Sequence, residues 1–593
     1  MPRTLAVALV LCALAFALPS VAGAVQGSRY HEGAGGTAGV IATESPAAAR
    51  AGRAVLARGG NAIDAAVTTV FALGSARPQS CGIGGGGFMV YRSPDGKVRA
   101  LDFRETAGAA TKADTFVPPG LHKTFTGHLT VGVPGVVAGM ATALHRFGSG
   151  KVTFADAIAP AERLARLGFR VPTSLSGAMA RRAKDIALFP AAAAQYLREG
   201  SPYQPGETLR QPDLSRSLRR LMAEGPKAMY GGALAKMVVR DMRAPRPETQ
   251  DAGLLTVKDF ASYHAIWRTA LHGTYRGRDV YAVPPVTSGG TTMLEILNIL
   301  EGLDLKGYGA GSAKAITAIA EAQKIAWADR NAFLADPAFV PQPLSVLLSK
   351  DYAAARRNEI DLGRAGTFQP SPNPFPPAVP AAAATRAAGE DFNPAGSTTH
   401  VSVIDAQGGA VAVTCTIEQE FGSTVIAPGT GFLLNNELTD FSGPGTANEP
   451  APGKRPRSSI NPTIVVQSGK PVLVAGAAGG ATIIMGPTLA VIDTVDFGMT
   501  LPQAVDAERF DAPGTNRLTI EDARVAPAVL DQLGAEGYTL VRQGEYGVVP
   551  RMQLAGLAPG PAGLATAVSD SRSDRGSLAV PPSAQAPSRA AVR

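Results

Sequence analysis

The chain has 593 residues, several times the length of a typical domain, so it can bury a large core. Hydrophobic residues make up 45% of it and charged residues only 18%, which excludes a disordered or purely solvating chain. The formal net charge is +8, but the 56 basic and 48 acidic residues are interspersed without a block of Lys and Arg. We therefore expect no nucleic-acid partner.

Residues 1–24 have the pattern of a signal peptide. Arg3 provides the charged start, residues 5–18 are apolar, and Ala22-Gly23-Ala24 is a small-residue cleavage site. The apolar stretch is shorter than the roughly 18 to 20 residues of a membrane-spanning helix, and no later segment has that composition. We expect a mature chain from residue 25 that is periplasmic or secreted, with no membrane span after signal removal.

Cysteines and histidines are too few and too scattered for a metal site. The chain has three cysteines and seven histidines, without a CxxC pair or an HExxH motif. We expect no metal and no other cofactor. Cys12 lies in the signal peptide, which leaves Cys81 and Cys415, and we expect these two to be unpaired.

The amino-terminal part begins with helices and continues with strands. Residues 45–73 predict two helices joined by a turn at Gly59-Gly60, with Asn61 capping the second. A glycine-rich turn then leads into a predicted hairpin of residues 88–91 and 98–105, which carries Arg104 at its end. The glycine run lacks the Lys-Ser/Thr ending of a phosphate loop and precedes a strand, so we exclude nucleotide binding there.

Helical composition dominates residues 135–360, and a segment rich in Pro and Ala at 367–397 predicts a flexible linker. Directly after it, a strand is predicted to begin at Thr398 and to form a hairpin with a second strand over 410–419. Because strand side chains alternate, Thr414, Thr416 and Glu418 share one polar face that can line a site.

These residues, with several longer motifs, resemble the γ-glutamyltransferases. In chain order the motifs are GGNAIDAAV, GIGGGGFMV, LDFRETA, VPGVVAG, PPVTSGG, AWADR, TTH, GTGFLLNNELTDF, GKRPRSSINPT and GAAGGATI. They extend over most of the chain, and so many long motifs in one order are a highly specific signal.

The resemblance implies an amino-terminal-nucleophile hydrolase made as an inactive precursor. The precursor would cut itself between Ser397 and Thr398 into a large subunit, 25–397, and a small catalytic subunit, 398–593, which ends in a flexible tail at 580–593. The two products would assemble as a heterodimer. The implied fold is α+β, a four-layer αββα sandwich of two mostly antiparallel sheets between helical layers, whereas composition alone supports only mixed α and β.

Within this family the new terminal threonine, here Thr398, is the nucleophile. A threonine hydroxyl is weak alone, and the freed α-amino group, with a reference pKa of about 7.7 to 8.0, can act as its base. The resemblance implies that Thr416 hydrogen-bonds the nucleophile. Gly479 and Gly480 would offer backbone N–H groups to a developing oxyanion.

The substrate implied by the resemblance is a small γ-glutamyl donor such as glutathione, with water or an amino acid as acceptor. Arg104 would bind the α-carboxylate, because a guanidinium is a bidentate partner for it, with help from Ser458 and Ser459. The acids that would surround the α-ammonium are Glu418, Glu437 and Asp440.

Some positions depart from the family pattern. Glu418 and Glu437 stand where many members carry asparagine or glutamine, and Arg457 replaces a usual apolar residue. Residues 443–453 form a shorter segment than the lid of some members, which predicts an open pocket that admits bulky γ-glutamyl compounds.

Three alternatives stay open. The first is an acylase of the same fold that acts on glutaryl-type β-lactam side chains, which have no α-amino group. The second is a relative that degrades poly-γ-glutamate. The third belongs to another class, an uncleaved and inactive extracellular binding protein.

Overall fold

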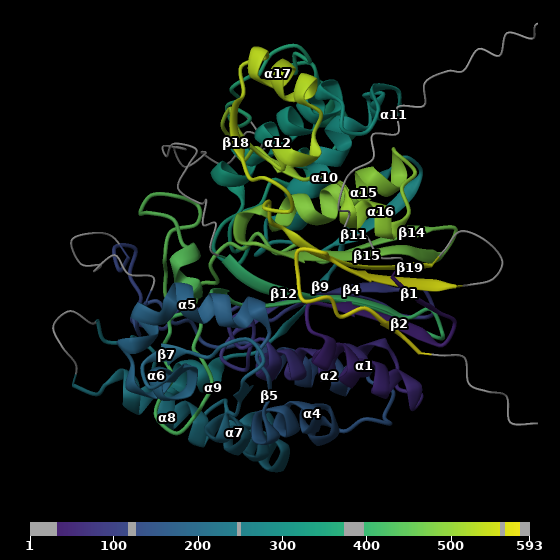
Figure 1. The fold of residues 1–593 in the computed structure, drawn as a ribbon. Helices are drawn as coiled ribbons and strands as arrows, with labels where there is room; N and C mark the ends of the chain where they lie inside the picture. The colour runs from purple at the N-terminus through teal and green to yellow at the C-terminus, as the bar shows by residue number, and fades with distance from the viewer. Residues whose placement is uncertain (1–32, 117–125, 246–250, 373–395, 558–563, 581–593) are drawn as a thin grey trace, which may run out of the picture.

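Two seven-stranded sheets lie face to face at the centre of the molecule (Figure 1). The computed structural model describes residues 33–116, 126–245, 251–372, 396–557 and 564–580. In spatial order, the first sheet consists of β1 (Ala34–Gly36), β20 (Ala565–Ser569), β19 (Arg551–Leu557), β15 (Lys470–Ala478), β14 (Thr463–Gln467), β11 (Arg278–Ala282) and β10 (Leu271–Tyr275).

The second sheet carries the segment of the predicted cut. Its order is β21 (Leu578–Ala579), β2 (Gly39–Thr43), β12 (Gly396–Asp405), β13 (Ala410–Gln419), β3 (Gly86–Arg92), β4 (Val98–Asp102) and β9 (Ile266–Thr269). Neighbouring strands run antiparallel throughout both sheets. β12 and β13 lie at the centre, between strands of the amino-terminal part.

One helical layer covers the outer face of the second sheet, at the bottom of Figure 1. Its helices are α1 (Pro46–Ala57), α2 (Ala62–Ala76), α3 (Val136–Phe147), α4 (Phe154–Leu167), α5 (Thr173–Ala187), α6 (Pro190–Tyr196), α7 (Pro212–Glu224), α8 (Ala233–Met242) and α9 (Val257–Ser262). Two short strand pairs, β5 (Phe169–Arg170) with β8 (Thr208–Leu209) and β6 (Leu197–Arg198) with β7 (Ser201–Pro202), join this region.

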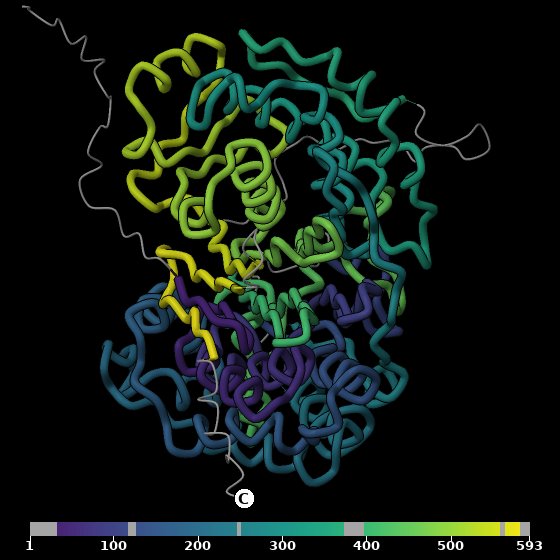
Figure 2. The backbone as a smooth tube through the Cα atoms, turned by 90° about the vertical axis from the view of Figure 1, so that its right-hand side faces the viewer, coloured from purple at the N-terminus to yellow at the C-terminus, as the bar shows by residue number. Residues whose placement is uncertain are grey.

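The other helical layer covers the first sheet, and the tube view of Figure 2 shows the two layers on opposite sides of the sheets. Its helices are α10 (Gly289–Leu300), α11 (Leu305–Tyr308), α12 (Ala313–Phe333), α13 (Leu344–Leu347), α14 (Lys350–Arg357), α15 (Met485–Val495), α16 (Leu501–Asp506) and α17 (Pro527–Ala535). A small sheet of β16 (Phe510–Asp511), β17 (Arg517–Ile520) and β18 (Thr539–Arg542) packs beside them. The αββα sandwich is therefore confirmed.

Alternation along the central strands divides the apolar core in two. Val403 and Val411 belong to the cluster under the second sheet, with the helices α1 to α9. Ile404 and Ala412 belong to a second cluster, which fills the space between the two sheets and extends to the helices that cover the first sheet. Each strand of the second sheet thus presents alternate side chains to the helices and to the first sheet.

The amino-terminal predictions are confirmed. α1 and α2 are joined at Gly59-Gly60, and Asn61 caps α2. The Asn61 side chain accepts a hydrogen bond from the Asp64 N–H at 3.0 Å, and the Asp64 carboxylate accepts one from the Asn61 N–H at 3.0 Å. β3 and β4 form the expected hairpin, but β4 ends at Asp102, so Arg104 lies just beyond the strand and not within it as predicted.

The predicted start of the nucleophile strand is wrong by two residues. β12 begins at Gly396, so Ser397 and Thr398 both lie within it. Pairing with β13 continues past the predicted cut, through a register shift between Gly396 and Thr398. Residues 373–395 of the predicted linker lie outside the described part of the chain.

The prediction of two unpaired cysteines is also wrong. Cys81 and Cys415 form a disulfide with a Cα–Cα distance of 5.5 Å. Cys81 lies in the loop between α2 and β3, and this loop passes under β13 where Cys415 points toward the helices. A pairing across 334 positions of sequence depends on tertiary structure, which spacing does not reveal.

The predicted signal peptide, 1–24, and residues 581–593 of the predicted tail lie outside the described residues. Within the described ranges, no helix is both long enough and apolar enough to cross a membrane.

Candidate active site

Thr398 and Thr416 are direct partners in the pairing of β12 with β13. The Thr398 hydroxyl donates a hydrogen bond to Thr416 Oγ1 at 3.2 Å, and both residues are buried. They lie on the face toward the first sheet, because Ser402, four positions further on the same face, donates to backbone carbonyls of β15 and β19. Thr416 Oγ1 also accepts the Glu418 N–H at 2.8 Å.

His400 lies on the same face as Thr398 but is engaged elsewhere. Its Nδ1 is 2.7 Å from Thr414 Oγ1 and its Nε2 is 3.1 Å from Ser402 Oγ. Burial lowers the pKa of His400 to about 3, so the imidazole is neutral at physiological pH. The structure therefore gives Thr398 a hydroxyl partner and assigns the nearby histidine to packing between the sheets.

The segment before the predicted cut also has a defined contact. Ser397 Oγ lies 2.8 Å from Ser80 Oγ, and both side chains are buried. Ser80 precedes Cys81 in the loop that the disulfide attaches to β13. The residues on both sides of the predicted cut are thus held by hydroxyl contacts.

Arg104 joins three of the segments predicted to bind substrate. Its Nη1 donates to Glu437 Oε2 and its Nη2 to Asp440 Oδ2 in two short, charge-assisted hydrogen bonds, while its Nε donates to Pro456 O at 3.2 Å. The Arg104 side chain is 1% exposed and that of Asp440 is 30% exposed. The predicted carboxylate-binding group therefore pairs with two predicted ammonium-binding groups.

The backbone around Arg104 is held in place from several sides. Asp102 Oδ1 accepts the Arg104 N–H at 2.9 Å, and the Arg104 carbonyl accepts from Arg455 Nη1 at 2.8 Å and from the Tyr263 hydroxyl at 2.9 Å. Hydrogen bonds with three residues therefore fix the backbone that carries the guanidinium.

Carboxylates outnumber cations around this guanidinium. Glu105, which sequence reasoning missed, lies with Oε2 at 3.9 Å from Arg104 Nη1, and neither of its buried oxygens has a hydrogen-bond partner among the described residues. Burial and the neighbouring Glu437 raise the pKa of Glu105 well above its usual value. Burial also raises the pKa of Glu437 to about 7, against the opposing effect of Arg104. The only sequence signal for Glu105 was its place after Arg104 in LDFRETA.

Glu418 ends the polar face of β13. Its φ of 74° interrupts the regular strand geometry one residue before β13 ends, and the next residue, Gln419, donates its N–H to Asn436 Oδ1 at 3.2 Å. Asn436 in turn donates its N–H to Ile417 O at 3.3 Å. These two bonds hold Asn436, and with it the neighbouring Glu437, against the carboxyl end of β13, the strand that carries Thr416.

The two predicted serines lie in the segment that borders Arg104. Ser459 Oγ accepts from Arg330 Nη2 at 2.9 Å, and Ser458 O accepts from the Ser288 N–H at 2.8 Å. Arg330 also donates from Nε to Ser288 Oγ at 2.8 Å. Sequence reasoning placed AWADR among the motifs but did not single out Arg330 as the residue that holds this segment.

Arg457 connects the same segment to the carboxyl end of α12. Its Nη1 donates to Arg330 O at 3.1 Å, and the residue is buried. Its Nη1 also donates to Asn331 O and Leu334 O at 3.4 Å each, and a cation interacts favourably with the carbonyls at a helix carboxyl terminus. This contact explains why a charged residue is accommodated where we expected an apolar one.

The glycine pair follows β15 and begins a turn that contacts β12. Gly479 has φ 150° and Gly480 has φ 61°, and Gly480 begins a 3₁₀ turn, Gly480–Ile484, that packs against β12 and leads into α15. The predicted helix start is therefore a tighter turn followed by an α-helix. The oxyanion role of the two N–H groups stays a prediction.

The shortened segment over 443–453 folds back on itself. The Ser442 N–H donates to Asn448 O at 2.9 Å, and Asn448 Nδ2 donates to Asp440 O at 2.7 Å. Lys454 Nζ donates to Ala447 O at 2.8 Å. The segment thus supports Asp440 directly.

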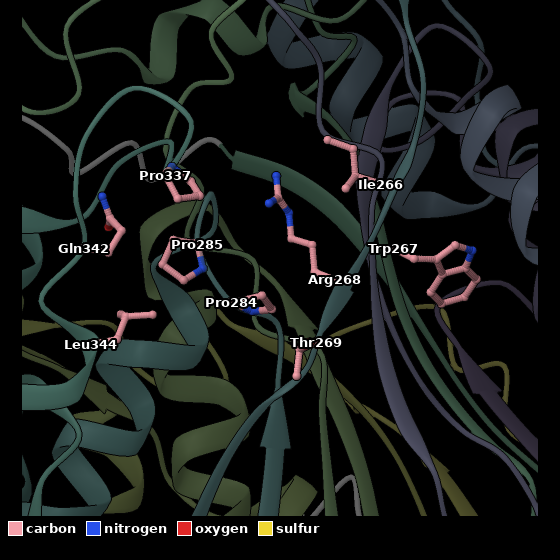
Figure 3. A pocket seen from close by; sticks show the side chains of 9 residues that line it. All are labelled: Ile266, Trp267, Arg268, Thr269, Pro284, Pro285, Pro337, Gln342 and Leu344. Atoms are coloured by element: carbon pink, nitrogen blue, oxygen red, sulfur yellow. The ribbon is translucent and has the colours of Figure 1, made fainter.

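A separate cavity of about 420 Å³ lies beside the edge strand β9 (Figure 3). Its lining includes Arg268, whose guanidinium pairs with Asp102 at 2.7 Å. Figure 3 shows Arg268 extending between Ile266 and the three prolines, with Trp267 turned away. None of the predicted site residues lines it, so the cavity is not the predicted nucleophile site. Within the described ranges, no group of three or more His, Cys, Asp or Glu is arranged to hold a metal ion.

Comparison with known proteins identifies the family. The family model for gamma-glutamyltranspeptidase matches residues 48–580. The chain belongs to this family. It is 37% identical over 552 residues to the glutathione hydrolase proenzyme of Escherichia coli (strain K12), a match that covers 90% of each chain.

Two further relatives carry other names. The Acylase ACY 1 proenzyme of Pseudomonas sp. (strain SE83) is 37% identical over 520 residues, which covers 86% of this chain and 88% of the relative. A crystal structure of cephalosporin acylase from Bacillus halodurans superposes with a TM-score of 0.82 at 25% identity and covers 96% of this chain and 99% of that one. Membership of the family confirms that the protein is an enzyme of the amino-terminal-nucleophile fold.

Proposed function

We propose that the protein is a γ-glutamyltransferase and glutathione hydrolase that cuts itself between Ser397 and Thr398. The observation that carries the proposal is the Thr398 hydroxyl, buried between the sheets and 3.2 Å from Thr416 Oγ1, at the position of the predicted cut. The products would be the chains 25–397 and 398–593. They would stay together because β12 and β13 lie between strands of the larger product.

Cutting converts Thr398 into an amino-terminal residue with a base of its own. The freed α-amino group takes the hydroxyl proton, and Oγ1 attacks the γ-carbonyl carbon of the donor. The carbonyl–nitrogen bond breaks, the amine leaves with a proton, and a γ-glutamyl ester of Thr398 remains. Water or an amino acid then attacks the ester and releases glutamate or a new γ-glutamyl amide.

The surroundings of Arg104 support a donor that carries both a carboxylate and an ammonium. Arg104 can accept the α-carboxylate by giving up part of its pairing with Glu437 and Asp440. Those two acids, and Glu418 at the end of β13, would then face the α-ammonium. An excess of carboxylates around one buried guanidinium favours the binding of an added cation.

A second candidate is an acylase for glutaryl side chains, which the names of the Pseudomonas relative and of the superposed Bacillus halodurans enzyme favour. A glutaryl group has a carboxylate but no α-amino group. With the glutaryl carboxylate on Arg104, the acids Glu437, Asp440 and Glu418 would then have no ammonium to bind, so their presence supports the γ-glutamyl donor.

The short segment over 443–453 supports large donors. Because it folds back through Asn448, it leaves fewer residues to cover the pocket than a longer lid would. We propose that bulky γ-glutamyl compounds, including the ends of poly-γ-glutamate, are accepted. Failure to turn over any donor larger than a dipeptide would count against this part of the proposal.

The decisive assay compares a γ-glutamyl anilide with the matching glutaryl anilide, on the mature protein. The proposal requires faster release of the aniline from the γ-glutamyl compound. A faster glutaryl reaction would support the acylase instead. The Thr398→Ala protein should remain uncut and hydrolyse neither compound.

A further inference from the structure

We infer that the Cys81–Cys415 disulfide covalently joins the two products of self-cleavage. Cys81 belongs to the proposed larger product and Cys415 to the smaller one, so cutting between Ser397 and Thr398 turns a link within one chain into a link between two. This inference rests on the proposed function, because without the cut there are no two chains to join.

The disulfide lies in the interior of the protein. Both cysteines are 1% exposed and lie in the apolar cluster under the second sheet. Burial protects the bond from reductants once the protein has folded.

The link lies directly behind the proposed active site. Cys415 precedes Thr416 on β13 and points to the opposite face, toward the helices. On the other side, Cys81 follows Ser80, whose hydroxyl lies 2.8 Å from that of Ser397. The disulfide thus fastens the loop that contacts the residue before the cut to the strand that supports the nucleophile.

Forming the link is an oxidation. Two thiols lose two protons and two electrons as the sulfur–sulfur bond forms, and a disulfide-bearing oxidant is reduced to a dithiol by thiol–disulfide exchange. Such oxidants act in the periplasm and other exported compartments. The disulfide therefore agrees with the predicted signal peptide over 1–24.

The link changes how the mature enzyme behaves once it is unfolded. Two separate chains must find each other again, so their recovery depends on protein concentration. Two linked chains refold as one molecule, because the link keeps each at a high effective concentration near the other. In the native fold the two products also interleave in the second sheet, where β12 and β13 lie between β2 and β3 of the larger product.

The direct test is electrophoresis of the mature protein after free thiols have been blocked in denaturant. The inference predicts one full-length species without reductant and two fragments with reductant, the smaller beginning at Thr398. Two fragments without reductant would overturn the link while leaving self-cleavage intact. One species under both conditions would overturn self-cleavage, and the link between products with it.

Peptide mapping separates the disulfide from the cut. A digest made without reductant should contain one cross-linked pair of peptides, with Cys81 in one and Cys415 in the other. The uncut Thr398→Ala protein should contain the same pair. Detection of both cysteines as blocked thiols would overturn the inference, whatever the gel shows.

The Cys81→Ala protein tests the consequence. After unfolding in urea and hundredfold dilution, the linked enzyme should recover the same fraction of activity at every protein concentration. In the variant, the recovered fraction should fall at least about tenfold across a hundredfold range of protein concentration. Equal recovery curves for the two proteins would contradict a covalent link.

Discussion

The hydroxyl oxygens of Thr398 and Thr416 lie 3.2 Å apart because the two residues face each other in the β12–β13 pairing. Thr416 Oγ1 also accepts the Glu418 N–H, so both of its lone pairs are engaged and only its own proton is left to donate. The position of the proposed nucleophile relative to Thr416 therefore depends on the register in which β12 pairs with β13.

Replacing Thr416 by Val keeps the shape of the side chain and removes the hydroxyl. We expect kcat for γ-glutamyl anilide hydrolysis to fall on the order of 10²-fold with little change in KM, because alignment of the nucleophile is lost. Thr414→Val is the matched control, since Thr414 lies on the same face but bonds to His400. An equal loss in the control would contradict a specific role for Thr416.

Arg104→Lys keeps the positive charge but removes the planar guanidinium, which can form two hydrogen bonds at once. Lysine cannot form the two simultaneous bonds that Arg104 makes to Glu437 and Asp440, nor hold an α-carboxylate in the same way. We expect donor KM to rise about 10- to 100-fold, measured by steady-state kinetics. Arg181→Lys, at an exposed pair with Glu420, should leave KM unchanged. Equal KM values for the wild type, Arg104→Lys and Arg181→Lys would show that Arg104 does not bind the donor.

The raised pKa of Glu437 predicts a pH-dependent donor affinity. Because burial raises this pKa to about 7, Glu437 is protonated below that pH and contributes no negative charge to ammonium binding. We expect KM to fall as pH rises from about 6 to 8 in the wild type and to stay level in Glu437→Gln. In both proteins kcat should rise with deprotonation of the Thr398 α-amino group. A KM that varies with pH equally in both would contradict this assignment.

The raised pKa of Glu437 also makes the free energy of unfolding depend on pH. A carboxyl whose pKa is higher in the folded than in the unfolded state binds more protons when folded, so the free energy of unfolding falls as pH rises from about 4.5 to 7. The unfolding free energy of Glu437→Gln minus that of the wild type should therefore increase as pH rises from about 4.5 to 7. Urea denaturation at several pH values measures it, and a constant difference would contradict the raised pKa.

Arg457→Met tests the buried contact with α12. Methionine fills similar space but removes the donor that Arg457 offers to the Asn331 and Leu334 carbonyls at the end of the helix, and we expect a loss of about 1 to 3 kcal/mol in unfolding free energy. Thermal unfolding at constant pH measures the effect, with Arg457→Lys expected to lose less. An unchanged midpoint for Arg457→Met would show that the helix end is satisfied by other means.

Local elements could be predicted from the sequence because their signals are local. Gly59-Gly60 and Asn61 specify the break between α1 and α2, and alternation specifies the β12–β13 hairpin. The strands β9 to β11 were not predicted. They lie within a region of helical composition and gain their stability from pairing at the sheet edges.

Site predictions depended on motifs, and the long-range contacts stayed hidden. Arg104 and Glu437 are 333 positions apart, and only the resemblance placed them together. Burial of Glu105 and the pairing of Cys81 with Cys415 depend on packing, for which neither residue type nor spacing provides a signal. Sequence reasoning therefore found the residues of known motifs and missed the partners that packing adds to them.

The most direct test of self-cleavage is amino-terminal sequencing of the smaller fragment of the purified mature protein after reduction and electrophoresis. We expect two fragments, the smaller beginning Thr-Thr-His-Val at Thr398. A single chain that stays uncut on prolonged incubation, or a fragment that begins at another residue, would contradict Thr398 as the nucleophile.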